Sequence, residues 1–219
     1  MPSKQKTIKD EDVVRIFGRA NSINVQKAMW MIGELGLKHE RVDVGLQFGI
    51  NDTPEYLTKN PNGLVPTLED GDVIVWESHS IVRYLADKFG ADTHWWPNDV
   101  VGRAHAGQWM DWYASRLHAP MTTIFWNVVR YPPEKRDPDA VVAATADAEK
   151  MWAILDTQLS SKDFIGGAAP SVGDIPVGCA IHRWNAMDFD KPAFANIDAW
   201  YARLSDRITY QDHVMLPLS

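Results

Sequence analysis

Two short polar segments of this chain place serine, asparagine and glutamate immediately before runs of helical periodicity. Ser22 and Asn24 lie in RANSINVQK, and Glu77 and Ser78 lie in WESHSIVRYLA. The free N–H groups and the dipole at a helix N-terminus stabilise an anion, so either segment could hold a carboxylate or a thiolate. A serine in this position also caps a helix without any ligand, and for an isolated pair capping is the simpler interpretation.

The other reactive side chains give little support for metal or disulfide chemistry. The single cysteine, Cys179, excludes an internal disulfide and a thiolate cluster, and we expect it to be a buried apolar residue in a reducing compartment. The seven histidines are scattered, with no close helical pair beside a carboxylate motif. We therefore predict no metal site.

Composition narrows the class of protein further. The 219 residues are 45% hydrophobic and 23% charged, as in folded globular proteins, and the formal net charge is -7. That charge repels phosphate backbones and anionic lipid surfaces. No stretch approaches the roughly 18 apolar residues that span a bilayer, and the first residues have no signal-peptide core. We expect a soluble, cytoplasmic protein that binds neither nucleic acid nor membrane.

The first half of the chain alternates strand and helix signals. The Thr53-Pro54 pair is typical of a helix start, and Asp70-Gly71 favours a tight hairpin. Hydrophobic periodicity supplies the other elements. In order, we predict a strand at 13–18, a helix at 24–35, a strand at 39–46, a short helix from 53, two strands within 65–77 and an amphipathic helix ending at Gly90.

The second half carries only helical signals. From about residue 97 onward, apolar positions recur at helical spacing between segments with proline or glycine. We predict a loose N-terminal arm at 1–12, a mixed domain at 13–91 and an all-helical domain at 98–219, with the linker near HWWPND.

Residues 60–86, NPNGLVPTLEDGDVIVWESHSIVRYLA, resemble the glutathione transferase superfamily. A Val-Pro pair opens a strand, a hairpin follows, and Glu-Ser begins the next helix, in the order and at the separation of that family. The resemblance covers nearly the whole chain from Val13. It implies a thioredoxin-like α/β domain followed by an all-α helical bundle, a cis Val65-Pro66 bond and a homodimer.

The same resemblance implies where glutathione binds. Val65, before Pro66, would pair with the cysteinyl backbone of the tripeptide as a one-residue added strand. Ser78 would receive the γ-glutamyl carboxylate at its helix N-terminus, and Glu77 would hold the adjacent ammonium. Asn51 occupies the region where relatives place a polar contact to the glycyl end. Glutathione is thus the expected co-substrate, with no metal.

The reactive thiol would belong to glutathione. Its unperturbed pKa is roughly 8.5, so the protein must stabilise the thiolate at neutral pH. The family uses a tyrosine, serine or cysteine after the first strand, and here only Ser22 and Asn24 remain as candidates. Ser-x-Asn-x-x-Lys resembles the bacterial serine-type members, theta-like or nu-like, and either residue could be the principal donor.

The function that the resemblance implies is transfer of glutathione to a small, apolar electrophile. We expect the second-substrate pocket between the Ser22 loop and the first helix of the bundle, near Trp109, Trp112, Tyr113 and Arg116, with 126–140 as a covering loop. A glutathione-dependent disulfide reductase or peroxidase of nu type is one alternative. A noncatalytic binding protein of the same fold is another.

The segment SVGD, 171–174, resembles the buried capping box of the same family. Ser171 would cap a helix and Asp174 would reach back to its backbone. This motif should stabilise the helical half without contacting the substrates.

Overall fold

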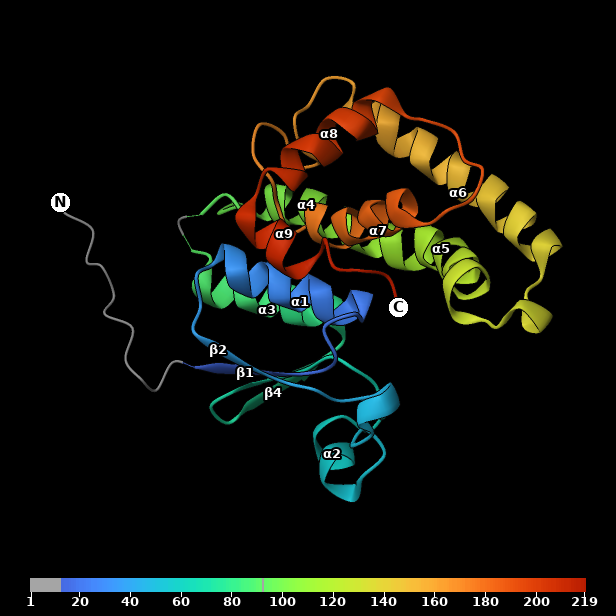
Figure 1. The fold of residues 1–219 in the computed structure, drawn as a ribbon. Coiled ribbons are helices and arrows are strands. Elements are labelled where there is room, and N and C mark those ends of the chain that lie inside the picture. The colour runs from blue at the N-terminus through green and yellow to red at the C-terminus, as the bar shows by residue number, and fades with distance from the viewer. Residues whose placement is uncertain (1–12, 92) are drawn as a thin grey trace.

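The computed structural model describes residues 13–91 and 93–219, so the predicted arm at 1–12 lies outside the described residues. A four-stranded mixed sheet with the order β2-β1-β3-β4 forms the base of the N-terminal part (Figure 1). Its elements are β1 Val14–Phe17, α1 Ile23–Glu34, β2 His39–Val42, the 3-10 turn η1 Leu46–Phe48, α2 Pro54–Lys59, β3 Thr67–Asp70, β4 Val73–Trp76 and α3 Ser78–Phe89.

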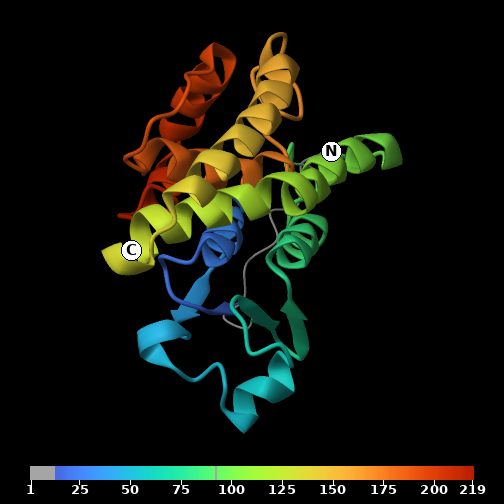
Figure 2. The same cartoon turned by 90° about the vertical axis from the view of Figure 1, so that its right-hand side faces the viewer.

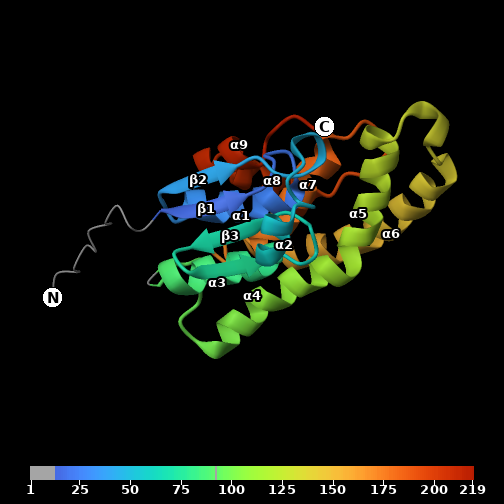
Figure 3. The same ribbon diagram turned by 90° about the horizontal axis from the view of Figure 1, so that it is seen from below.

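Strand pairing follows the predicted β-α-β-α-β-β-α order. β1 pairs with β2 in parallel and with β3 antiparallel, and β3 pairs antiparallel with β4. From below, β2, β1 and β3 lie side by side in that order (Figure 3). Helices α1 and α3 cover one face of the sheet, and α2 lies on the other (Figure 1).

Two predicted boundaries were wrong. The second strand was expected to reach residue 46 but ends at Val42, because the chain turns into η1 at Gly45, whose φ is 89°. The hairpin turn consists of Gly71 and Asp72, one residue later than predicted, since Asp70 still pairs with Val73. Gly71 has a φ of 60°, a conformation that favours glycine.

The remainder of the chain is helical. It contains α4 Val100–Trp112, the π-helical turn η2 Tyr113–Leu117, α5 His118–Phe125, the π-helical turn η3 Trp126–Arg130, the 3-10 turn η4 Pro133–Lys135, α6 Pro138–Leu159, α7 Asp174–Ala186, α8 Ala195–Ser205 and α9 Ile208–His213. These helices stack on the side of α1 and α3 that faces away from the sheet (Figure 2). The fold is thus a thioredoxin-like unit followed by a helical unit; the limits 13–91 and 98–219 remain predictions.

Helix α1 is buried on nearly every side because it lies between the sheet and the helical part. It packs against α3, α7 and α9 as well as β1. Residues Val25 to Ile32 are all buried, including Lys27, which is 1% exposed. The Lys27 ammonium is consequently removed from water, so burial and the groups around it determine whether it is protonated.

Large rings fill the core between the helices. Trp30 contacts Trp95 and Tyr210 edge to face, with ring centroids 6.0 and 4.8 Å apart. Trp152 and Trp184 form a further pair. Most of the tryptophan content therefore serves packing, and each such ring contributes a large apolar area.

The predicted motif at 171–174 lies at the start of α7, where the N-cap is Gly173 and not Ser171 as expected. Asp174 Oδ2 accepts from the Ser171 backbone N–H over 2.8 Å, as expected for a residue that reaches back. Asp174 Oδ1 also accepts from the Ile165 N–H and the Trp200 indole N–H. The carboxylate therefore joins three segments of the helical part.

No helix among the described residues is long and apolar enough to cross a membrane.

Candidate active site

Ser22 lies at the N-terminus of α1 with its hydroxyl uncommitted. It occupies the N-cap position, with φ -79° and ψ 123°, yet its side chain makes no cap hydrogen bond. Gly18 follows the last residue of β1, and Ser22 N–H donates to the Arg19 carbonyl, which closes the turn. The side chain is 6% exposed and lines a cavity. Simple capping therefore does not account for this serine.

Asn24 connects the start of α1 to the start of α3. Its Oδ1 accepts from Lys27 Nζ over 3.0 Å and, more weakly, from Ser78 Oγ over 3.4 Å. Both contacts occupy the oxygen, because an ammonium can only donate. The amide nitrogen of Asn24 thus faces the other way as a donor.

Lys27 is the unusual charge of this site. Its Nζ lies 3.2 Å from His79 Nε2 and 4.2 Å from the centre of the Tyr113 ring. Burial lowers the pKa of the Lys27 ammonium from 10.5 to about 7. Burial likewise lowers the pKa of His79 to about 2, so His79 is neutral and accepts from the lysine. Neither partner neutralises the Lys27 charge, and a bound anion would.

Glu77 and Ser78 form the second pair. Ser78 is 6% exposed and is the first residue of α3, whereas the Glu77 side chain is exposed. The φ of Glu77 is 68°, in the left-handed region that costs a non-glycine residue about 1–3 kcal/mol. A cavity of about 300 Å³ lies beside these residues and reaches Asn24, Lys27 and His118.

The loop before β3 supplies the backbone of the predicted glutathione site. The Val65-Pro66 bond is cis, as the resemblance predicted. Val65 lies beside Gly18, where an added Cβ would stand 3.2 Å from Val65 Cβ. Asn51 lines neither cavity of the site, because its Nδ2 donates to the Gly63 carbonyl over 2.9 Å and holds the loop together.

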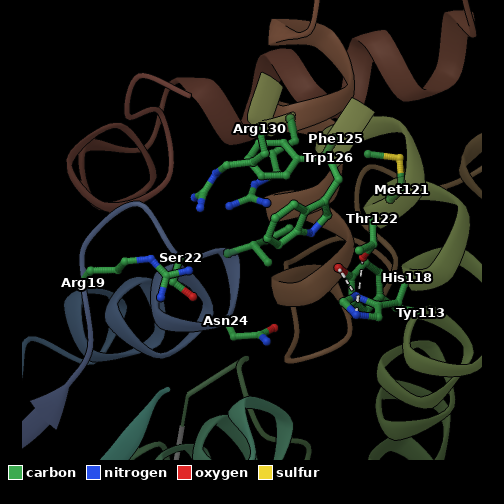
Figure 4. A pocket seen from close by; sticks show the side chains of 12 residues that line it. Arg19, Ser22, Asn24, Tyr113, His118, Met121, Thr122, Phe125, Trp126 and Arg130 are labelled. Carbon is green, nitrogen blue, oxygen red and sulfur yellow. Dashed lines mark hydrogen bonds between the residues drawn. The ribbon is translucent and has the colours of Figure 1, made fainter. Parts of the chain in front are cut away.

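A second cavity, of about 210 Å³, opens on the other side of Asn24. Ser22 and Arg19 lie on one wall, and Tyr113, Phe125 and Trp126 supply aromatic surface opposite (Figure 4). His118, Met121, Thr122, Arg130 and Arg183 complete the lining together with Ile23 and Asn24. Asn24, Tyr113 and His118 line both cavities, so the two spaces meet beside Asn24.

This cavity lies between the Ser22 loop and the helical part, as predicted, but most of the residues predicted to line it do not. Of the four residues expected near it, only Tyr113 lines it; Trp109 packs against Trp112 with ring centroids 5.1 Å apart, and Arg116 is exposed. Trp126 and Arg130, at the start of the expected covering segment, do line it.

Two π-helical turns explain why the residues that line the cavity differ from those predicted. η2 begins at Tyr113 and η3 at Trp126, and each widens the helix where it borders the cavity. Pro120 has no N–H to donate to the carbonyl of Arg116, which accounts for the irregular helix near η2. Such turns shift the phase of every later side chain, and π-helical turns are frequent at functional sites.

Among the described residues, no group of three or more histidine, cysteine, aspartate or glutamate side chains is arranged to hold a metal ion.

The fold is that of a glutathione transferase, and comparison with known proteins agrees. The family model described as "Glutathione S-transferase, N-terminal domain" matches residues 12–87, and "Glutathione S-transferase, C-terminal domain" matches residues 111–203. Glutathione S-transferase GstB of Escherichia coli is 36% identical over 209 residues, which cover 94% of this chain and 100% of that protein. A dichloromethane dehalogenase of Methylophilus leisingeri is 28% identical over 80% of this chain and 68% of its own.

Solved structures give the same result. The theta class glutathione S-transferase of Xanthomonas axonopodis pv. citri, with glutathione bound, is 40% identical with a TM-score of 0.91 and covers 95% of this chain and 100% of its own. This chain belongs to the glutathione S-transferase family. It is a transferase, and glutathione is its co-substrate.

Proposed function

We propose that Ser22 and Asn24 together hold the glutathione thiolate at the N-terminus of α1. The observation that carries this proposal is the buried Ser22 hydroxyl, which lines the cavity without capping its own helix. Asn24 adds a second donor because Lys27 occupies its oxygen. The helix dipole and the Lys27 ammonium add positive potential, so all four features lower the pKa of the glutathione thiol.

The remaining predicted contacts complete the binding of the tripeptide. Glu77 and Ser78 bind the γ-glutamyl group, and the backbone beside the Val65-Pro66 bond pairs with the cysteinyl residue. The exposed Glu77 carboxylate and the buried Ser78 at the start of α3 support the first contact. Asn51 acts indirectly, since it fixes the loop at Gly63 that precedes Val65.

The chemistry is nucleophilic attack by sulfur. The thiol proton passes to solvent, the sulfur lone pair forms a C–S bond to the electrophile, and the bond to the leaving group breaks with its electron pair. A Michaelis acceptor would instead take up a proton after addition. The aromatic wall of Tyr113, Phe125 and Trp126 supports an acceptor with an apolar body, which the second cavity would hold beside the sulfur.

The test is difference absorbance of bound glutathione thiolate against pH for the wild type, Ser22→Ala and Asn24→Ala. We expect a depressed thiol pKa in the wild type and the larger rise in Ser22→Ala. A larger rise in Asn24→Ala would transfer the principal role to Asn24. No thiolate signal near neutral pH in the wild type would contradict the proposed site and favour disulfide chemistry.

We also propose that the protein acts as a cytoplasmic homodimer. Edge strand β4 supports the dimer, because Val73, Ile74 and Trp76 are all exposed although apolar. Light scattering after size exclusion should give about twice the 24.7 kDa chain mass. A monomer at micromolar concentration would contradict this part of the proposal.

A further inference from the structure

Three arginines surround the second-substrate cavity. Arg19 reaches it from the loop before α1, Arg130 from η3 and Arg183 from α7. In Figure 4 the guanidinium ends of Arg19 and Arg130 point inward from two sides, toward Ser22. The three groups thus come from distant parts of the chain and meet around one space.

Arg183 is buried and Arg19 and Arg130 are half-buried, and all three have an unpaired nitrogen. Among the described residues, Nε of each of the three is buried without a hydrogen-bond partner. Arg183 is only 8% exposed; one of its terminal nitrogens donates to the Asn21 carbonyl, and its guanidinium lies 4.1 Å from the centre of the Phe125 ring. Buried donors that are left unpaired are costly, so their retention points to a ligand that pairs them.

Among the described residues, no carboxylate lines the cavity beside these positive charges. None of the twelve residues that line it is acidic, although the whole chain has a net charge of -7. Burial, with a smaller contribution from repulsion by Arg130 and Arg19, lowers the pKa of Arg183 to about 10. Three like charges that repel one another in a low-dielectric space would be stabilised by an anion there.

We propose that the second substrate of this transferase is an anionic electrophile, an apolar body with a carboxylate that the guanidinium groups of Arg19, Arg130 and Arg183 bind. The guanidinium plane matches a carboxylate with two parallel hydrogen bonds, whereas the aromatic wall would hold the body of the molecule. This inference rests on the proposed function, because it assigns the acceptor of the same site.

The position of the three arginines also indicates that the carboxylate they would bind is not one of those of glutathione. The proposed γ-glutamyl site at Ser78 borders the cavity of Lys27 and His79, which contains none of the three arginines. Asn51 and Gly63, near the expected glycyl end, do not line the arginine cavity either. Arg130 and Arg183 therefore stand on the side of Ser22 where the acceptor would bind. Arg19 lies nearer the tripeptide, since a Cβ added at Gly45 would be 3.2 Å from Arg19 Nη1 and 3.6 Å from Val65 Cγ1.

A matched pair of acceptors tests the proposal: 4-chloro-3,5-dinitrobenzoate and its methyl ester. In both, glutathione sulfur bonds to the chlorine-bearing ring carbon, chloride leaves with the electron pair of the C–Cl bond, and the thiol proton goes to solvent. The readout is the ratio of kcat/KM for the carboxylate to that for the ester, each corrected for the uncatalysed rate. Arg130→Gln is the principal variant, Arg19→Gln the second, and Arg116→Gln, an exposed arginine outside both cavities, the control.

We expect the wild type to prefer the carboxylate, and Arg130→Gln and Arg19→Gln each to lower the ratio by about 10- to 100-fold, the loss typical of a hydrogen bond to a charged group. Arg116→Gln should leave the ratio unchanged. A wild type that uses the ester as well as the carboxylate, or a ratio that neither variant lowers, would overturn the anionic acceptor while leaving the transferase function intact. A wild type inactive on both compounds would instead contradict the proposed function on which the inference rests.

Inhibition by benzoate, with benzamide as its neutral counterpart, provides a second test that needs no variant. We expect benzoate to compete with the methyl ester and not with glutathione, and benzamide to inhibit at least tenfold more weakly, again the scale of one such hydrogen bond. Competition of benzoate with glutathione would assign the arginines to a carboxylate of the tripeptide and overturn the proposal.

Discussion

Lys27 donates to Asn24 Oδ1 over 3.0 Å within α1, a helix buried between the sheet and the helical part. The contact orients the Asn24 amide, so that its nitrogen is free to donate toward the thiolate. It also places a cation beside the proposed sulfur position, with neutral His79 on its other side. Lys27 thus both orients the Asn24 amide and supplies the positive charge beside the proposed thiolate.

Removal of this charge should raise the thiol pKa of bound glutathione. In Lys27→Met the apolar part of the side chain remains, whereas the ammonium and its bond to Asn24 are lost. We expect a rise of roughly one unit, at the lower end of what a nearby charge produces. Difference absorbance against pH measures it, with Lys150→Met, on exposed Lys150 of α6, as control. Superimposable curves for the wild type and Lys27→Met would contradict a role for the charge.

The same lysine should give the stability of the protein without ligand a distinctive pH dependence. Burial lowers the Lys27 pKa from 10.5 to about 7, so between these values the unfolded chain binds a proton that the native protein does not. The contribution of Lys27 to the free energy of unfolding therefore rises with pH between about 7 and 10.5. The cost of burying its charge is greatest below pH 7.

Lys27→Met removes that cost. The free energy of unfolding of Lys27→Met minus that of the wild type should be larger at pH 6 than at pH 10, by up to roughly 4 kcal/mol. The variant is therefore stabilised most, relative to the wild type, at low pH. Urea denaturation at the two pH values measures the difference, and Lys150→Met should show no such change. A pH-independent difference between Lys27→Met and the wild type would mean that the ammonium is solvated.

Local motifs in the sequence indicate the candidate site more clearly than the cavity beside it. Ser22 and Glu77 immediately precede a helix, and Asn24 and Ser78 lie in the first turn of the same helices, so each pair is held at a helix N-terminus. Their meeting required the parallel pairing of β1 and β2 and the β3-β4 hairpin, which the order of elements predicts. Strand and hairpin limits shifted because Gly45 and Gly71 turn the chain at positions that periodicity does not reveal.

The arginine cluster had no comparable signal. Arg183 donates to the Asn21 carbonyl, 162 positions away in the sequence. At that separation, the spacing of residues in the sequence does not predict which side chains meet. Arg130 faces the cavity because η3 changes the phase of its helix, so a regular helical wheel would misplace it. Arg19 lies three positions before Ser22, in the loop between the first strand and the first helix, and this proximity to Ser22 was the one clue available in the sequence.

Ser78→Ala should weaken glutathione binding with little change in folding. Ser78 is buried at the start of α3, where its hydroxyl and N–H would both meet the γ-glutamyl carboxylate. We expect KM for glutathione to rise about 10- to 100-fold, the loss typical of a hydrogen bond to a charged group. Steady-state kinetics at saturating acceptor measure this. Ser80→Ala, at an exposed position of the same helix, is the matched control; an equal rise in both variants would contradict the assignment.

Cys179 should be inert in the native protein. Its side chain is fully buried, and burial raises the pKa of its thiol from 9.0 to about 12. Because the thiolate is the reactive form, a shift of this size lowers its population about a thousandfold. A chromogenic disulfide reagent should label Cys179 quickly in urea and very slowly without it, and Cys179→Ala should retain turnover. Rapid labelling of the native protein with loss of activity would show that this thiol takes part in the reaction.

Asp174 should be a structural residue whose loss lowers stability and leaves the catalytic constants unchanged. Its two oxygens accept from the Ser171 and Ile165 backbone N–H groups and from the Trp200 indole. Asp174→Ala leaves these buried donors unpaired, so we expect the free energy of unfolding to fall by roughly 3–5 kcal/mol.

The matched control is Asp147→Ala, which removes an exposed carboxylate paired with Lys150 and should cost less than about 1 kcal/mol. Urea denaturation of both variants gives the two losses, and kinetics well below the melting temperature test the site. Equal losses in the two variants would contradict the network at Asp174. A changed thiol pKa in Asp174→Ala would instead mean that α7 transmits its position to Arg183 and the cavity.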